Sequence, residues 1–228
     1  MKSKYIFWLA VFLGGCGQYP NPNDITAVSA EARAAIGYKR LESAGTTLEF
    51  KVQNGEISDE RRAELLGKVA DDMLKNIDPK AIPNSDQWMY AALLRVTNRW
   101  GDAESALKLA VKFAPDEDRR INDSLKLAQT QAKNKEVVDA IASASSVLNA
   151  SDADAAPILP AVLLEIVPAG QGQGHDKELA DLLSKAIECH RRVKVDRNSE
   201  AGKSFLIASR YHIRNAEAKI GELSGSKN

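Results

Sequence analysis

The spacing of apolar residues is the feature that most restricts the fold of this 228-residue chain. Apolar residues recur three and four positions apart along most of the sequence and alternation is rare, so the pattern predicts helices and almost no sheet. Breaks such as Asn54-Gly55, Pro83 and Pro115 fall between the periodic segments. We therefore expect an all-α fold, with helices over residues 25–53, 59–77, 85–99, 102–114, 117–133, 135–148, 157–167, 176–194 and 199–222.

Residues at the ends of these segments are typical of helix starts. Ser58, Asp102 and Ser199 are expected N-caps, and Pro157 suits a first helical turn. The segment 85–99 is apolar around most of its circumference, which indicates a helix packed on more than one side. Trp88 shares its remaining face with Arg95 and Arg99, so we expect a ring that closes the end of a core, with a guanidinium against the indole as the alternative.

A helical face repeats in the middle of the chain. Shifting residues 101–115 forward by 34 positions superposes small and apolar residues on residues of the same kind. The pairs are Ala103 with Val137, Ala106 with Ala140, Leu107 with Ile141, Ala110 with Ala144, and Ala114 with Leu148. A period of this length is typical of stacked helical hairpins.

The segment "GDAESALKLAVKFAP" resembles the second half of a tetratricopeptide repeat. Ala103 and Ala110 stand at that repeat's two small-residue positions, and Pro115 stands at its closing proline. The first half departs from the pattern, because Trp88 and Tyr90 are not at the expected spacing. The resemblance covers residues 85–148 at best and implies a tetratricopeptide-like α-α superhelix; an alanine-rich helical hairpin is the alternative.

The first 16 residues have the layout of a secretory signal. Lys2 and Lys4 precede an apolar core over residues 5–13, and small residues follow. The apolar core is too short to span a bilayer, which needs about 20 apolar residues. The segment "LGGC" then resembles the lipobox of bacterial lipoproteins, with Leu13 and Gly15 at its apolar and small positions and Cys16 as the lipidated residue.

The lipobox resemblance implies cleavage before Cys16 and a triacylated anchor at that cysteine. More than one acyl chain is enough for stable membrane attachment. Gly17 replaces the aspartate that is the family's inner-membrane retention signal, so the expected location is the outer membrane, facing the periplasm. We expect a signal peptide over 1–15, a lipidated cysteine and tether over 16–24, a helical repeat domain over 25–148 and a C-terminal helical segment over 149–228.

The charge is balanced overall but unevenly distributed. Residues 17–184 contain 19 Lys/Arg and 26 Asp/Glu, whereas residues 185–228 contain 10 Lys/Arg and 5 Asp/Glu. Arg191, Arg192, Lys194 and Arg197 surround the turn of the last predicted hairpin, and we expect them to form a partner-binding surface. The surface could instead cover the protein's own acidic helices, bind acidic phospholipids, or simply be solvated. Export from the cytoplasm argues against nucleic acid.

The remaining motifs do not predict chemistry. "SEAGKS" (199–204) lacks the glycine and the preceding strand of a phosphate-binding loop, and "GQGQG" (170–174) is typical of a linker. An antiparallel hairpin turning near residue 196 places His190 level with residue 203 rather than with His212, so we expect His190 to be a core residue rather than a metal ligand. Cys189 has no disulfide partner once Cys16 is lipidated.

Two functions remain. The first is a membrane-anchored helical-repeat scaffold that binds envelope proteins of the assembly, secretion or pilus type. The second is a helical small-ligand or cell-wall-binding lipoprotein, which could have a weak enzymatic activity. Because no catalytic motif is present, we favour the scaffold, with no enzymatic activity, no cofactor and no metal site, and with membrane lipid and an envelope protein as partners.

Overall fold

The structure is a computed structural model that describes residues 25–150 and 155–225, and every regular element in those ranges is a helix. The all-α prediction is thus confirmed for this part of the chain. Three short 3-10 helices are η1 (Ile25–Ala27), η2 (Ala30–Ala32) and η3 (Asn84–Asp86). The longer helices are α1 (Arg33–Gln53), α2 (Asp59–Leu74), α3 (Gln87–Val96), α4 (Trp100–Lys112), α5 (Glu117–Lys133), α6 (Val137–Ser145), α9 (Asp176–Arg191) and α10 (Glu200–Gly225).

Two of the three predicted N-caps are confirmed. The Ser58 hydroxyl accepts a hydrogen bond from the Arg61 backbone N–H, and the Ser199 hydroxyl accepts one from the Gly202 N–H. The prediction for Asp102 is wrong, because α4 begins at Trp100. Asp102 lies in the first turn instead, and its carboxylate accepts two hydrogen bonds from the Arg99 guanidinium.

The helix predicted over 157–167 has three parts. These are α7 (Ile158–Ala161), a π-helical turn η4 (Val162–Ile166) and α8 (Val167–Gly170). Pro168 is the second residue after the π-turn; it has no N–H to donate, and its ring clashes with the carbonyl four residues earlier, within that turn. The proline therefore accounts for the widened turn.

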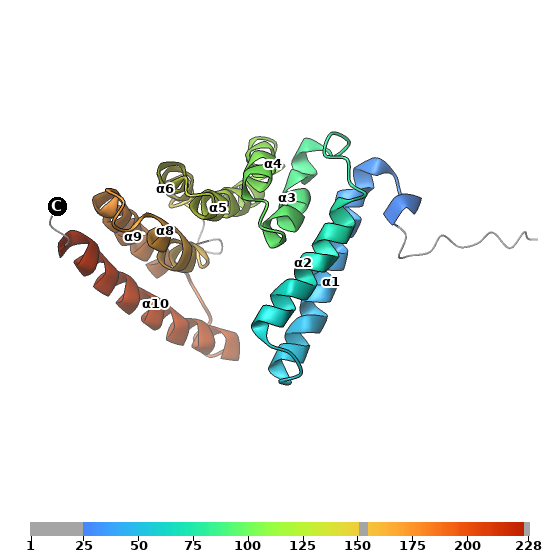
Figure 1. Ribbon diagram of the computed structural model, residues 1–228. Coiled ribbons are helices and arrows are strands. Elements are labelled where there is room, and N and C mark those ends of the chain that lie inside the picture. Colours follow the sequence, from blue (N-terminus) through green and yellow to red (C-terminus); the bar gives the residue numbers. More distant parts are fainter. Residues whose placement is uncertain (1–24, 151–154, 226–228) are drawn as a thin grey trace, which may run out of the picture.

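Helices that follow one another along the chain pack side by side. The pairs α1/α2, α3/α4, α5/α6 and α9/α10 are adjacent, and each of the first two pairs also contacts the pair that follows it. Figure 1 shows the result as an arch: the long α1/α2 hairpin stands at one end, α9 and α10 stand at the other, and helices α3 to α6 join them.

The first three hairpins turn in the same way. In each hairpin, the second residue after the end of the first helix has a positive φ. These residues are Gly55 (φ 72°), Asn98 (φ 58°) and Lys135 (φ 66°). The following N–H then bonds to a carbonyl five residues earlier, as in Glu56 to Lys51, Arg99 to Leu94 and Glu136 to Gln131, each at 2.9 Å. This is the Schellman arrangement, which satisfies carbonyls at the end of a helix.

The buried apolar residues form two cores that meet at α5. One core joins α1 to α4 and includes Leu127 of α5, and the other joins α5 to α10 through Leu125, Ala128 and Ala132. The second core runs from α6 into α7 and α9, so apolar packing is continuous across residue 148. Helix α5 is therefore apolar on two sides because it is packed on two sides.

The face that repeats in the sequence is buried in both copies. Ala103, Ala106 and Ala110 of α4 are buried, as are their counterparts Val137, Ala140 and Ala144 of α6. Small residues there let neighbouring helices approach closely. The hairpins differ in length, however, since α1 has 21 residues and α3 has 10.

Candidate functional site

The four cations predicted to bind a partner lie together around the turn between α9 and α10. They line a hollow of about 600 Å³ whose other walls are Val193, Val195 and Leu206. Its lining of cations and small apolar groups suits an anionic partner with some apolar surface. We call this the basic hollow.

The turn beside the basic hollow is held by its own hydrogen bonds. The Ser199 hydroxyl donates to the Asp196 carbonyl at 2.8 Å and accepts from the Gly202 N–H at 3.0 Å. The Asp196 carboxylate accepts from the Asn198 N–H at 2.9 Å. Lys203 pairs with Glu200 at 2.7 Å, so "SEAGKS" forms a helix start rather than a phosphate-binding loop.

Two of the four cations also hold the fold together. Arg191 pairs with Glu217 of α10 at 2.9 Å, and Arg192 donates to the Leu148 carbonyl at 2.6 Å and to the Cys189 sulfur at 3.2 Å. Arg197 is exposed and makes no ion pair with any residue of the described ranges. Arg197 is therefore the residue whose charge can be changed with the least effect on packing.

A second cluster surrounds Trp88. The Arg119 guanidinium lies 3.5 Å from the indole centroid and the Lys126 ammonium lies 5.4 Å from it. A guanidinium does lie against the indole, which was the alternative for Trp88, but the cations come from α5 and not from Arg95 or Arg99 of the segment 85–99. Arg119 is held in place by two hydrogen bonds to the buried Asp123 carboxylate, at 2.6 and 3.0 Å.

The Trp88 cluster extends over four elements. From α1, the Tyr38 ring meets Trp88 edge to face at 4.7 Å, and its hydroxyl donates to Glu42 at 2.6 Å. Burial and the neighbouring Glu42 carboxylate raise the pKa of Tyr38 to about 12. Towards the C-terminus, Arg95 donates to Gln129, which donates to Glu165 of η4 at 2.7 Å. Sequence spacing on one helix could not show these contacts between hairpins.

Lys126 is a half-buried member of this cluster. Burial and the nearby positive charge of Arg119 lower the pKa of Lys126, while Asp123 pulls the pKa the other way. The side chain also lines a hollow of about 290 Å³ with Pro157, Pro160 and Leu164.

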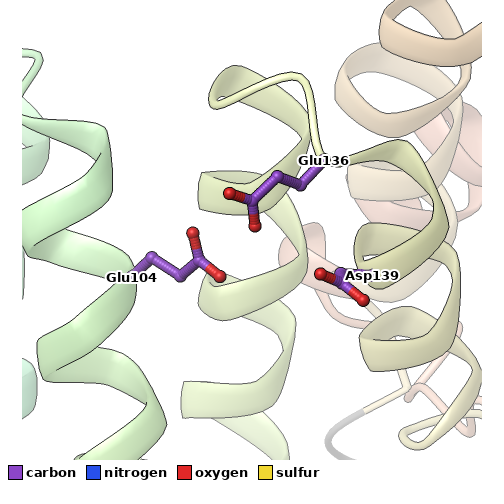
Figure 2. Close-up of side chains that lie close together, drawn as sticks. All are labelled: Glu104, Glu136 and Asp139. Atoms are coloured by element: carbon purple, nitrogen blue, oxygen red, sulfur yellow. The ribbon is translucent and has the colours of Figure 1, made fainter.

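Three carboxylates meet between α4 and α6 (Figure 2). Ligand oxygens of Glu104, Glu136 and Asp139 lie within 4.8 Å of one another, which is the kind of donor set that Mg²⁺ or Ca²⁺ prefers. Glu104 is already satisfied, since Lys108 (2.7 Å), Asn134 (3.1 Å) and Gln131 (3.4 Å) contact its carboxylate. We therefore interpret the three carboxylates as part of a network of polar contacts between the α3/α4 and α5/α6 hairpins.

The pKa of Glu104 and the pKa of Glu136 depend on each other. Burial tends to raise the pKa of Glu104, but hydrogen bonds with Lys108, Glu136 and Gln131 outweigh it and lower that pKa. A hydrogen bond to Glu104, together with burial and its charge, raises the pKa of Glu136. No pattern in the sequence predicts this pair, because its members are 32 positions apart on different hairpins.

His190 is a core residue, as the sequence predicted. It is buried with Leu179, Leu183 and Ala186, and its ring lies 5.2 Å from the ring of Phe205, close to the level expected for a hairpin turning near residue 196. Cys189 is buried and free.

Cys16, the predicted lipidation site, lies outside the described residues. Among the helices that are described, none combines the length and the apolar character needed to cross a membrane.

Comparison with known proteins found no match among protein-family models, curated proteins or solved structures.

Proposed function

We propose that this chain is an envelope lipoprotein, anchored through an acylated Cys16, that acts as a helical-repeat scaffold for other envelope proteins of the assembly, secretion or pilus type. The expected membrane is the outer one, with the protein facing the periplasm. The anchor follows from the resemblance of "LGGC" to a lipobox and from the positive and apolar segments before it.

The proposed arrangement is a tetratricopeptide-like α-α superhelix. It is supported by three successive hairpins that share one turn geometry, at Gly55, Asn98 and Lys135. It is also supported by burial of the repeated alanine face in α4 and α6. Stacked hairpins of this kind present extended surfaces, which proteins use to bind other proteins.

The basic hollow is the observation that carries the proposal of partner binding. It gathers four cations at one end of an otherwise acidic chain, beside apolar side chains that a protein partner could cover. Charge at such a surface acts mainly on the rate of encounter and is screened over about 8 Å at physiological salt. We therefore expect an acidic protein partner whose capture weakens as salt increases.

The experiment is crosslinking of the full chain in its native envelope, followed by mass spectrometry. Arg197→Glu should remove one or more crosslinked proteins at low salt, because Arg197 reaches the basic hollow without holding the fold. Lys39→Glu, an equal charge change at an exposed position of α1, should retain them. An unchanged set of crosslinked proteins in Arg197→Glu would refute the docking role.

A second candidate function is binding of a small anionic ligand. The observation that favours it is the hollow beside Lys126, where an ammonium group borders apolar walls from Pro157, Pro160 and Leu164. A carboxylate with a short apolar group would fit both features. A thermal-shift screen of small carboxylates, repeated on Lys126→Met, would distinguish this function from the scaffold.

A further inference from the structure

Helix α10 is attached to the arch mainly along one side. It packs on α9, with a smaller contact to α7. Ala216 and Leu223 are its buried apolar residues, whereas Ile207 (70 % exposed) and Tyr211 (64 % exposed) face away from the core. Its polar ties include the Arg191–Glu217 ion pair and a 3.4 Å hydrogen bond from Lys219 to Gln171.

A histidine with no hydrogen-bond partner is buried in this contact. His190 of α9 is 3 % exposed, and neither Nδ1 nor Nε2 of its ring has a partner; Nδ1 of His212 on α10 is also buried without one. Buried polar atoms are nearly always paired, so three unpaired ring nitrogens in one contact are unusual. Their arrangement is stable only while the His190 ring remains uncharged.

The surroundings of His190 do not favour a positive charge. From α10 it meets the Phe205 ring, with 31° between the ring planes, and the titratable group that acts on it is His212. The segment before α7 brings the backbone of Ala156 near, outside hydrogen-bond geometry. The neighbouring Arg191 is paired with Glu217, so that carboxylate is already engaged.

We propose that His190 makes the α9–α10 contact a pH-sensitive latch: it is closed while the His190 ring is neutral, and acidification releases α10. A proton on His190 would place a charge in an apolar contact, against the Phe205 ring and with no hydrogen-bond partner for either ring nitrogen. Separation of the helices lets water solvate the His190 ring, and it uncovers Ala216 and Leu223, which lie on the opposite side of α10 from the exposed Ile207. The latch does not depend on the anchor, but its opening would also change the basic hollow, because Arg191 of α9 and Leu206 of α10 both line it.

The direction of the effect follows from linkage. Burial and the charge of His212 lower the pKa of His190 from its ordinary 6.5 in the closed state. The open state, with a solvated ring, therefore binds the proton first. Above the open-state pKa the opening equilibrium does not depend on pH; below it, one proton multiplies the opening constant by up to about tenfold per pH unit.

The test is hydrogen–deuterium exchange of the full chain at pH 7.5, 6.5 and 5.5, with rates corrected for the intrinsic effect of pH. We expect the opening constant of α10 to rise about fivefold between pH 6.5 and 5.5, because one proton binds the solvated ring with the ordinary pKa of 6.5, while α1 and α2 keep their protection. Equal protection of α10 at all three pH values would overturn the proposal.

Variants separate His190 from the other histidines. His190→Leu keeps the site apolar and should abolish the pH dependence of α10, whereas His175→Gln, at the N-cap of α9, should retain it. If His190→Leu retains the full dependence, the latch is wrong. If that variant does not fold, NMR titration of the wild-type His190 replaces it: the pKa of His190 must lie below the ordinary imidazole value of 6.5, and a pKa at or above that value would overturn the proposal.

Discussion

Gly202 occupies a position where no side chain fits. A Cβ atom built there would lie 1.9 Å from the Asp196 carbonyl oxygen, which is backbone and cannot move aside cheaply. Gly202 also donates its N–H to the Ser199 hydroxyl, so it closes the turn beside the basic hollow. The reason for a glycine here is space, because its φ is not positive.

Gly202→Ala should therefore destabilise the protein, even though alanine is the better helix former. Overpacking of this kind costs about 1–3 kcal/mol. Gly221→Ala, in the same helix with open space around the position, should instead stabilise by about 0.5–1 kcal/mol. Urea denaturation of both variants measures the difference; two stabilising substitutions would contradict the close approach at Gly202.

The Glu104–Glu136 pair should make stability depend on pH. The pKa of Glu136 is raised in the folded state, so its favourable contribution is present below the ordinary value of 4.5 and is lost as the pH rises through the higher folded value. Glu136→Gln keeps this side chain neutral at every pH. We expect the variant to melt at a higher temperature than the wild type at pH 7, with the difference shrinking towards pH 5.

Glu56→Gln is the matched control for that measurement. Glu56 is an exposed carboxylate in the turn after α1, and its replacement should leave the difference in melting temperature nearly constant over the same pH range. A Glu136→Gln variant that behaves like this control would show that the two carboxylates do not interact.

At the scale of the helices, close contact depends on the repeated alanines. Ala110 is fully buried, and its counterpart Ala144 is buried at the equivalent position of α6. Ala110→Leu should overpack the contact and cost about 1–3 kcal/mol. Ala142→Leu, on the exposed side of α6, should change the free energy of unfolding by no more than about 0.5 kcal/mol. Equal effects in denaturant titrations would refute the close packing.

At the scale of the whole molecule, the anchor decides where the arch is held. Since Cys16 is the predicted acceptor of the lipid, Cys16→Ser should abolish acylation and leave the protein unprocessed or poorly attached to membranes. Metabolic labelling with a fatty acid and detergent fractionation measure this. Cys189→Ser is the control, because Cys189 is buried in α9 and should have no part in attachment. Normal processing of Cys16→Ser would contradict the lipoprotein proposal.

The sequence predicted much of the structure at the scale of single helices. The bounds of α5 agree with the predicted 117–133, and Ser58, Ser199 and His190 have the roles expected of them. These features depend on neighbours within about one helical turn. The predicted N-cap at Asp102 is wrong because α4 already begins at Trp100, with Arg99 as its N-cap. The predicted regular helix over 157–167 contains a widened turn because of Pro168.

The sequence by itself determined that this chain is helical, where most of its helices begin and end, and where its positive charge is concentrated. Tertiary structure alone decided which groups meet: Arg119 with Trp88, Glu104 with Glu136, and His190 with Phe205. The physical reason is the separation along the sequence of the residues that interact. Periodicity and capping depend on residues three or four apart, whereas each of these pairs joins separate helices, and its geometry depends on how small residues such as Ala110 and Gly202 let the backbones approach.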